Sequence, residues 1–208
     1  KLLNSIGLTA DSMICCGDGF NDISMIEYAG LGVAMENAQP IVKETADFIL
    51  FNTCCVREHA ELRTFGNVGF VKELKQKNPR LILGVCGCMM QQETVLQTLR
   101  QKYRHVDIVF GTFNLYKLPE LVATRMESGE TVYDIWQEQR EVVEDLPAIR
   151  HFPYKASVNI MFGCNNFCSD CIVPYVRGRE RSRTPEDILA EVRRLAADGV
   201  KEVMLLGQ

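Results

Sequence analysis

The sequence predicts an α/β protein whose strands are mainly parallel. Short apolar runs alternate along the chain with stretches in which apolar residues recur every three or four positions. This alternation is typical of βαβ units, in which parallel strands join one sheet and helices cover it. With 208 residues, 47% of them hydrophobic, the chain can form one large domain or two small ones.

Most of the predicted elements fall in the first 126 residues. Strands are expected at residues 12–16, 32–35, 47–51, 81–85 and 107–110, and helices near residues 22–29, 56–77, 91–102 and 115–126. Residues 127–150 differ, because Glu and Asp are dense there and the apolar period is lost. We therefore predict an acidic linker over 127–150.

The last segment, residues 151–208, predicts a strand, a helix and a second strand. The strands are expected at 157–161 and 202–206. Thr184 can cap the helix, Pro185 suits its first position and Asp187 completes a capping box. Such a βαβ unit would be parallel, and in a barrel the chemistry lies at the C-terminal ends of the strands.

Three cysteines follow the strand at 157–161, at the position where that rule places the chemistry. They are Cys164, Cys168 and Cys171, in Gly-Cys-Asn-Asn-Phe-Cys-Ser-Asp-Cys. A cubic four-iron cluster takes one thiolate per iron, so three cysteines leave one iron open. A structural zinc site would need a fourth protein ligand, and the nearest histidine, His151, lies thirteen residues before Cys164. The spacing therefore favours a cluster over zinc.

This cysteine spacing, with Phe167 before the second cysteine, resembles the radical S-adenosylmethionine enzymes. Three segments in the same order resemble the methylthiotransferases within that group, over about residue 47 to the C-terminus. They are Asn-Thr-Cys-Cys-Val-Arg-Glu (52–58), Gly-Cys-Met (87–89) and Cys-Ile-Val-Pro-Tyr-Val-Arg-Gly-Arg-Glu-Arg-Ser-Arg (171–183).

The resemblance implies a fold and an activity. The fold is a Rossmann-like or flavodoxin-like parallel-sheet domain, incomplete here over 48–126, followed by the first βαβ unit of a partial radical SAM TIM-type barrel. The activity is transfer of a methylthio group to C2 of N6-dimethylallyladenosine in tRNA, near the anticodon. The implied cofactors are S-adenosyl-L-methionine and one or two [4Fe-4S] clusters, and the implied partners are tRNA and an electron donor of the flavodoxin or ferredoxin type.

The resemblance also assigns residues, although none of them is given a catalytic role. Cys164, Cys168 and Cys171 would hold the cluster that binds S-adenosylmethionine. Phe167 would pack near the adenine, and Arg177 or Arg183 would steady charged groups. A second cluster would use Cys54 and Cys88 together with a third cysteine from an earlier strand.

Four arginines form the one basic cluster of a chain whose net charge is −4. They are Arg177, Arg179, Arg181 and Arg183, interrupted by Glu180. They could be a solvated loop, or they could contact an anion such as a cofactor carboxylate or an RNA phosphate. Their place directly after the cysteine loop favours the anion contact.

Residues 1–47 carry a different motif. Cys-Gly-Asp-Gly-Phe-Asn-Asp, starting at Cys16, and the residues after it resemble the C-terminal motif of Cof-type haloacid dehalogenase phosphatases. Asp18 and Asp22 would hold Mg²⁺ through oxygen ligands, with Asn21 orienting them. The nucleophile, the phosphate-binding Ser/Thr and the lysine of that family lie outside this sequence. We predict a fusion of two family segments across residues 44–47.

The resemblance to the methylthiotransferases implies a third cysteine on an earlier strand, which the predicted fusion would replace. Cys15 and Cys16 lie at an equivalent strand end, so one hypothesis is that Cys16 replaces the lost ligand. The alternative is that both are small buried residues, and we expect Cys55 and Cys86 to be buried in this way.

Two further functions stay open from the sequence, a Mg²⁺-dependent phosphatase fragment and a non-catalytic iron-sulfur fragment. The chain's start is unlike a secretory signal, and nine cysteines without one favour a reducing, cytoplasmic location. No apolar run approaches the roughly 20 residues of a membrane helix, so no membrane partner is expected.

Overall fold

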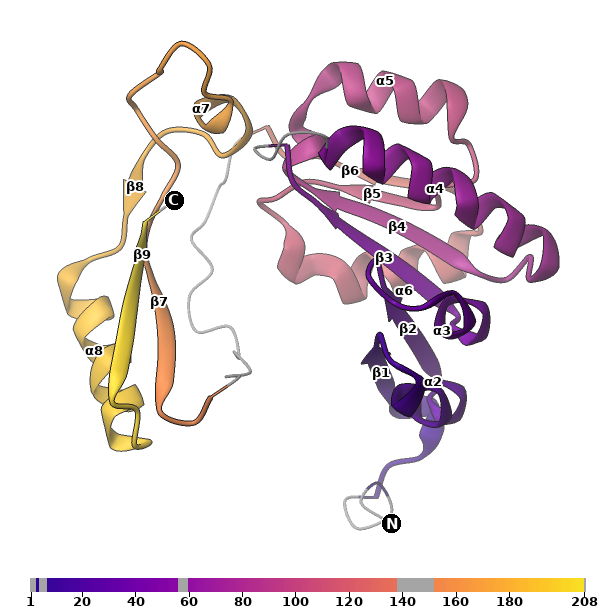
Figure 1. Ribbon diagram of the computed structural model, residues 1–208, viewed down its shortest axis with the longest axis horizontal. Coiled ribbons are helices and arrows are strands. Elements are labelled where there is room, and N and C mark those ends of the chain that lie inside the picture. Colours follow the sequence, from indigo (N-terminus) through magenta and orange to yellow (C-terminus); the bar gives the residue numbers. More distant parts are fainter. Residues whose placement is uncertain (1–2, 4–6, 56–59, 138–151, 208) are drawn as a thin grey trace. The chain divides into compact units, whose positions relative to one another are not determined.

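The computed structural model describes residue 3 and residues 7–55, 60–137 and 152–207. The chain divides into two compact units, Lys1–Gln137 and Glu138–Gln208. Both are shown in Figure 1. Among the helices of these described residues, none is long and apolar enough to cross a lipid bilayer.

The first unit is built on a six-stranded parallel sheet, which confirms the predicted fold class. Its spatial order follows the chain: β1 (Ile14–Gly17), β2 (Leu31–Met35), β3 (Phe48–Thr53), β4 (Ile82–Gly87), β5 (Ile108–Phe110) and β6 (Val132–Asp134). Every neighbouring pair is parallel. All six C-terminal ends therefore lie at the same edge of the sheet.

Helices cover both faces of this sheet. The α-helices are α2 (Ile23–Tyr28), α3 (Pro40–Thr45), α4 (Ala60–Lys77), α5 (Glu93–Lys102) and α6 (Leu118–Ser128), and the short 3-10 helices are η1 (Ala10–Ser12), η2 (Phe20–Asp22), η3 (Cys88–Gln91) and η4 (Leu115–Lys117). Buried side chains of α2 to α5 pack on one face, and those of α6 pack on the other. Figure 1 shows α4 and α5 opposite α6 across the sheet.

The sheet runs without a break through the predicted fusion point at residues 44–47. β2 pairs with β3, with Ala34 opposite Ile49. The Asp47 N–H donates to the Gly32 carbonyl at 2.9 Å, and the Gly32 N–H donates to the Asp47 carboxylate at 3.0 Å. The segments 1–47 and 48–126, predicted as separate, share one sheet in the structure.

Two short elements of this unit differ from the prediction. Residues 132–134 form β6 beside β5, so the interpretation of 127–150 as a linker is wrong for these three residues. The rest of that segment from residue 138 lies outside the described residues. The helix α3 was not predicted. Both elements are too short for a hydrophobic period to be visible in the sequence.

The second unit contains the predicted βαβ unit. Its elements are β7 (Lys155–Phe162), α7 (Val173–Val176), β8 (Arg181–Ser182), α8 (Pro185–Ala197) and β9 (Glu202–Gly207). The strand order is β8-β7-β9, with β7 and β9 parallel and β8 antiparallel to β7. As predicted, α8 begins with Thr184 as its cap: the Asp187 N–H donates to Thr184 Oγ1 at 3.3 Å.

Candidate metal sites

The loop with three cysteines begins where β7 ends. Gly163, directly after the strand, has φ +75°, and a Cβ there would lie 2.3 Å from the Arg179 carbonyl oxygen. The Cys164 N–H donates to the Gly178 carbonyl at 3.2 Å. The start of the loop is thus held against residues 178–179, at the C-terminal end of a parallel strand, as the sequence predicted.

The three thiols in this loop are all free. Cys164 and Cys171 are half-buried and Cys168 is exposed. The Cys171 N–H donates to the Cys168 carbonyl at 3.0 Å, which closes a turn between the second and third cysteine. In the part of the chain that the structure describes, no three His, Cys, Asp or Glu side chains are already grouped to hold a metal ion.

The donor set nevertheless fits an iron-sulfur cluster. Thiolates are the ligands that these clusters use, and one loop supplies three of them close to solvent. A half-buried or exposed cysteine can change its χ1 rotamer at little cost, so the three sulfur atoms can converge on a cluster.

Phe167 lies inside this loop in a strained conformation. Among the described residues it is the one non-glycine with positive φ, at +47°. Its ring is half exposed and meets the edge of Tyr175, with ring centroids 5.9 Å apart. Such positions are uncommon for a bulky residue and often occur at functional sites.

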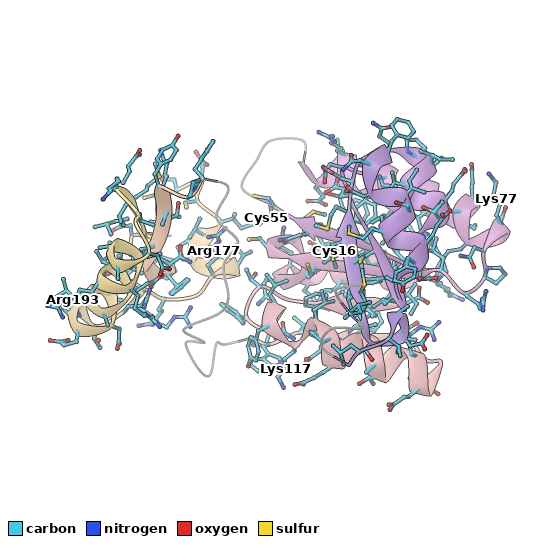
Figure 2. All side chains as sticks on the ribbon, turned by 90° about the horizontal axis from the view of Figure 1, so that it is seen from below. Cys16, Cys55, Lys77, Lys117, Arg177 and Arg193 are labelled. Carbon is cyan, nitrogen blue, oxygen red and sulfur yellow. The ribbon has the colours of Figure 1, made fainter. Side chains whose placement is uncertain are left out.

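The two arginines predicted to contact the cofactor differ in their surroundings. Arg183 Nη1 donates to Glu191 of α8 at 2.5 Å and to the Asn159 carbonyl of β7 at 2.9 Å, and the Arg183 side chain is only 8% exposed. Arg183 therefore ties α8 to β7. Arg177, labelled in Figure 2, has a buried Nε without a hydrogen-bond partner among the described residues.

The first unit holds a second group of cysteines where β3 and β4 end. Thr53 pairs with Gly87, so Cys54 and Cys88 follow at the same level of neighbouring strands. Thr53 Oγ1 donates to the Cys86 carbonyl at 2.5 Å. Gly87 has φ +97°, and a Cβ on it would lie 2.3 Å from the Thr53 carbonyl oxygen. The two strand ends are held in close contact.

Cys55 also belongs to this group, although the sequence pattern predicted it only as a buried residue. Its thiol is hydrogen-bonded to that of Cys88, and this bond, burial and the neighbouring Cys88 and Cys54 thiols raise the pKa of Cys55. Cys86 is fully buried as predicted, and burial together with Cys88 raises the pKa of Cys86 to about 12. Spacing alone could not distinguish Cys55 from its neighbour Cys54.

Cys16 lies outside this group, so the hypothesis that it replaces the lost ligand is wrong. Cys16 is level with Val33 on β2 and Phe48 on β3. Cys54 directly follows β3 and lies six residues beyond Phe48, which is roughly 20 Å at about 3.3 Å per residue. Figure 1 shows β3 and β4 extending past the end of β1, and Figure 2 labels Cys16 and Cys55. A sequence cannot reveal such a difference in register.

The two aspartates of the first motif lie in the loop after β1. Asp22 Oδ2 accepts the N–H groups of Asp18 and Gly19 at 3.0 and 3.1 Å, and Asn21 donates to Asp22 Oδ1 at 2.8 Å. Asp18 accepts a hydrogen bond from Asn37. Asn21 thus orients Asp22 as predicted. Mg²⁺ binding by Asp18 and Asp22 stays a prediction. In the structure, the hydrogen bonds that Asp22 accepts brace the turn.

Known families match the chain at both ends. The haloacid dehalogenase-like hydrolase family matches residues 1–54, which contain Asp18 and Asp22. The radical SAM superfamily matches residues 158–208, which contain Cys164, Cys168 and Cys171. Both resemblances drawn from the motifs are confirmed by these matches.

Curated relatives cover the chain more fully. Proteins named tRNA-2-methylthio-N(6)-dimethylallyladenosine synthase from Clostridioides difficile and Lachnoclostridium phytofermentans are 54% and 56% identical to it, over 89% and 79% of the chain. Most of the chain is a segment of the radical SAM methylthiotransferase family. The matches cover 37% and 36% of these two relatives, so the chain spans little more than a third of a methylthiotransferase.

One solved structure is similar in sequence to part of the chain. A crystal structure of a haloacid dehalogenase-like hydrolase from Bacteroides thetaiotaomicron is 57% identical to the chain. That match covers 24% of this chain and 18% of the hydrolase, with a TM-score of 0.23.

Proposed function

We propose that the chain is part of a radical S-adenosylmethionine enzyme that adds a methylthio group at C2 of N6-dimethylallyladenosine in tRNA. The observation that carries this proposal is the loop of three free thiols at the C-terminal end of β7, within the segment that matches the radical SAM superfamily. The names of the curated relatives support the tRNA substrate. An enzyme that modifies tRNA in this way would act in the cytoplasm.

Cys164, Cys168 and Cys171 would hold the [4Fe-4S] cluster. When bound, the cluster supplies the electron that reduces the sulfonium of S-adenosylmethionine, after reduction by a flavodoxin or ferredoxin type of donor. The protein's part is to hold the three thiolates in one loop and to orient the cofactor beside them.

Phe167 and Arg177 would orient that cofactor. The exposed Phe167 ring offers an apolar surface in the same loop for an adenine to stack on. The buried Nε of Arg177 offers a charged donor for a carboxylate or a phosphate. Arg183 has a supporting role, because its ion pair with Glu191 fixes α8 against β7.

The segment alone is expected to bind the cluster without completing the reaction, because it spans so little of its relatives. A phosphatase function is not proposed. Asp22 Oδ2 accepts the N–H groups of Asp18 and Gly19 and so braces its own turn.

The test is metal analysis after anaerobic reconstitution with iron(II) and sulfide. We compare the chain with a triple variant in which Cys164, Cys168 and Cys171 are replaced by alanine. The triple variant should contain about four fewer irons and four fewer sulfides per chain. Equal iron in both proteins would contradict the proposal. Cleavage of S-adenosylmethionine with a chemical reductant would extend the test from binding to chemistry.

A further inference from the structure

The end of β3 and the end of β4 bring three thiols together in the first unit. Cys54 and Cys55 follow β3, and Cys88 follows β4 as the first residue of η3. The pairing of Thr53 with Gly87 puts the two strand ends at the same level. The hydrogen bond between the Cys55 and Cys88 thiols then joins the two loops directly.

We propose that Cys55 supplies the third thiolate of a second iron-sulfur site, together with Cys54 and Cys88. This inference rests on the proposed function, because the resemblance to the methylthiotransferases implies a second cluster and assigns it two ligands in this chain, Cys54 and Cys88. The third would come from an earlier strand, and we predict that the haloacid dehalogenase-like segment stands in its place. Cys55 lies beside one assigned ligand in the chain and touches the other in space.

The other cysteines of this unit are worse placed. Cys16 lies six residues short of this level along the sheet. Cys86 is fully buried among the residues under α6, whereas Cys55 packs against the core on the opposite face of the sheet. A fourth thiol for a closed zinc site is therefore not on the same face as Cys55. Three thiols suit a cluster that leaves one iron open.

The side chains must still move when the cluster binds. The three cysteines are not yet grouped tightly enough to hold a metal ion within the described residues. Cys54 and Cys55 are half-buried, so each can change its χ1 rotamer without opening the core.

The experiment uses the full-length chain with Cys164, Cys168 and Cys171 replaced by alanine, so that iron at the first site cannot contribute. After anaerobic reconstitution with iron(II) and sulfide, this background should hold about four irons and four sulfides per chain. Adding Cys55→Ala should remove nearly all of both. Adding Cys16→Ala or Cys86→Ala, as matched controls, should remove neither.

Three results would overturn the inference: a background that binds no iron, a Cys55→Ala variant that retains it, or a Cys16→Ala variant that loses it. Far-UV circular dichroism of each variant separates lost binding from lost folding. A second readout is the visible charge-transfer absorption of the reconstituted background. Cys55→Ala should abolish this absorption and Cys16→Ala should leave it unchanged, and equal absorption in the two variants would also contradict the inference.

The proposed function can fail independently of this inference. It depends on the iron lost when Cys164, Cys168 and Cys171 are replaced, whereas the inference depends on the iron that remains after that replacement.

Discussion

Gly87 occupies a backbone position that other residues would not tolerate. Its φ of +97° lies in the region where side chains are strained, and a Cβ would lie 2.3 Å from the Thr53 carbonyl oxygen and 2.8 Å from the Thr53 nitrogen. These neighbours are backbone atoms of β3, which cannot turn aside as a side chain can. The close approach sets the distance between the two strand ends that carry Cys54 and Cys88.

Replacing Gly87 by alanine should therefore destabilise the first unit and disturb the second iron site. Strain and the steric clash together should lower the free energy of unfolding by about 3 kcal/mol. Urea denaturation measures this change, and iron analysis in the Cys164, Cys168 and Cys171 alanine background measures the effect on the site.

The matched control is Gly66→Ala, on the exposed side of α4. A Cβ at Gly66 meets nothing within 4 Å. Since alanine favours a helix more than glycine does, the free energy of unfolding of this variant should rise by roughly 0.5–1 kcal/mol. Equal effects of the two substitutions would show that Gly87 is not a close-contact position.

At the same residue scale, the cysteines show what the sequence could and could not predict. The spacing of Cys164, Cys168 and Cys171 identified a thiol loop after a strand, because all three positions lie on one short segment. The role of Cys55 depends on its contact with Cys88, thirty-three residues further along the chain. Only the register of β3 and β4 reveals that contact.

At the scale of elements, one carboxylate joins helices on both faces of the first sheet. Asp107, directly before β5, forms ion pairs with Lys75 of α4 and with Arg125 of α6, the latter at 2.8 Å. Asp107 also accepts the N–H of Leu83 on β4 at 2.8 Å. The Asp107 side chain is 7% exposed, so these bonds are shielded from water.

Asp107→Asn should be strongly destabilising, because it keeps the shape of the side chain but leaves two cations without their counter-charge. Breaking a buried pair typically costs 3–5 kcal/mol, and the partial exposure of Lys75 and Arg125 reduces the expected loss to about 2–3 kcal/mol. Thermal or urea unfolding measures it.

The pair Lys77–Glu44 provides the comparison, at 3.3 Å between largely exposed side chains. Glu44→Gln should change the free energy of unfolding by less than about 0.5 kcal/mol. A similar loss for the two variants would contradict a special role for Asp107.

Sequence patterns predicted long elements better than short ones. The start of α8 was predicted because Thr184, Pro185 and Asp187 act locally, within one turn of the chain. β6 was missed because three residues carry no visible period and its pairing with β5 is a tertiary contact. The same limit applies to α3.

At the scale of the whole molecule, the sequence predicted a fusion but not how its parts would pack. The motifs of two families meet near residues 44–47, and nothing in them predicts that β2 would pair with β3. In the structure, Ala34, Val42 and Ala46 from one segment are buried in the same core as Val68 and Val85 from the other. Such packing requires side chains of matching shape and apolar character.

A shared core predicts that the first unit unfolds as one cooperative body. Val42 of α3 is fully buried, so Val42→Ala should lower the free energy of unfolding by about 2 kcal/mol through lost burial and the cavity left behind. Because β4 shares that core, the slowest-exchanging amides of β2 and β4 should lose protection by the same amount in native-state hydrogen exchange.

Ile41→Ala is the control, since Ile41 is the preceding residue of the same helix and is 42% exposed. This variant should change the free energy of unfolding by less than about 0.5 kcal/mol. Loss of protection in β2 alone would mean that the haloacid dehalogenase-like segment unfolds separately from the methylthiotransferase segment.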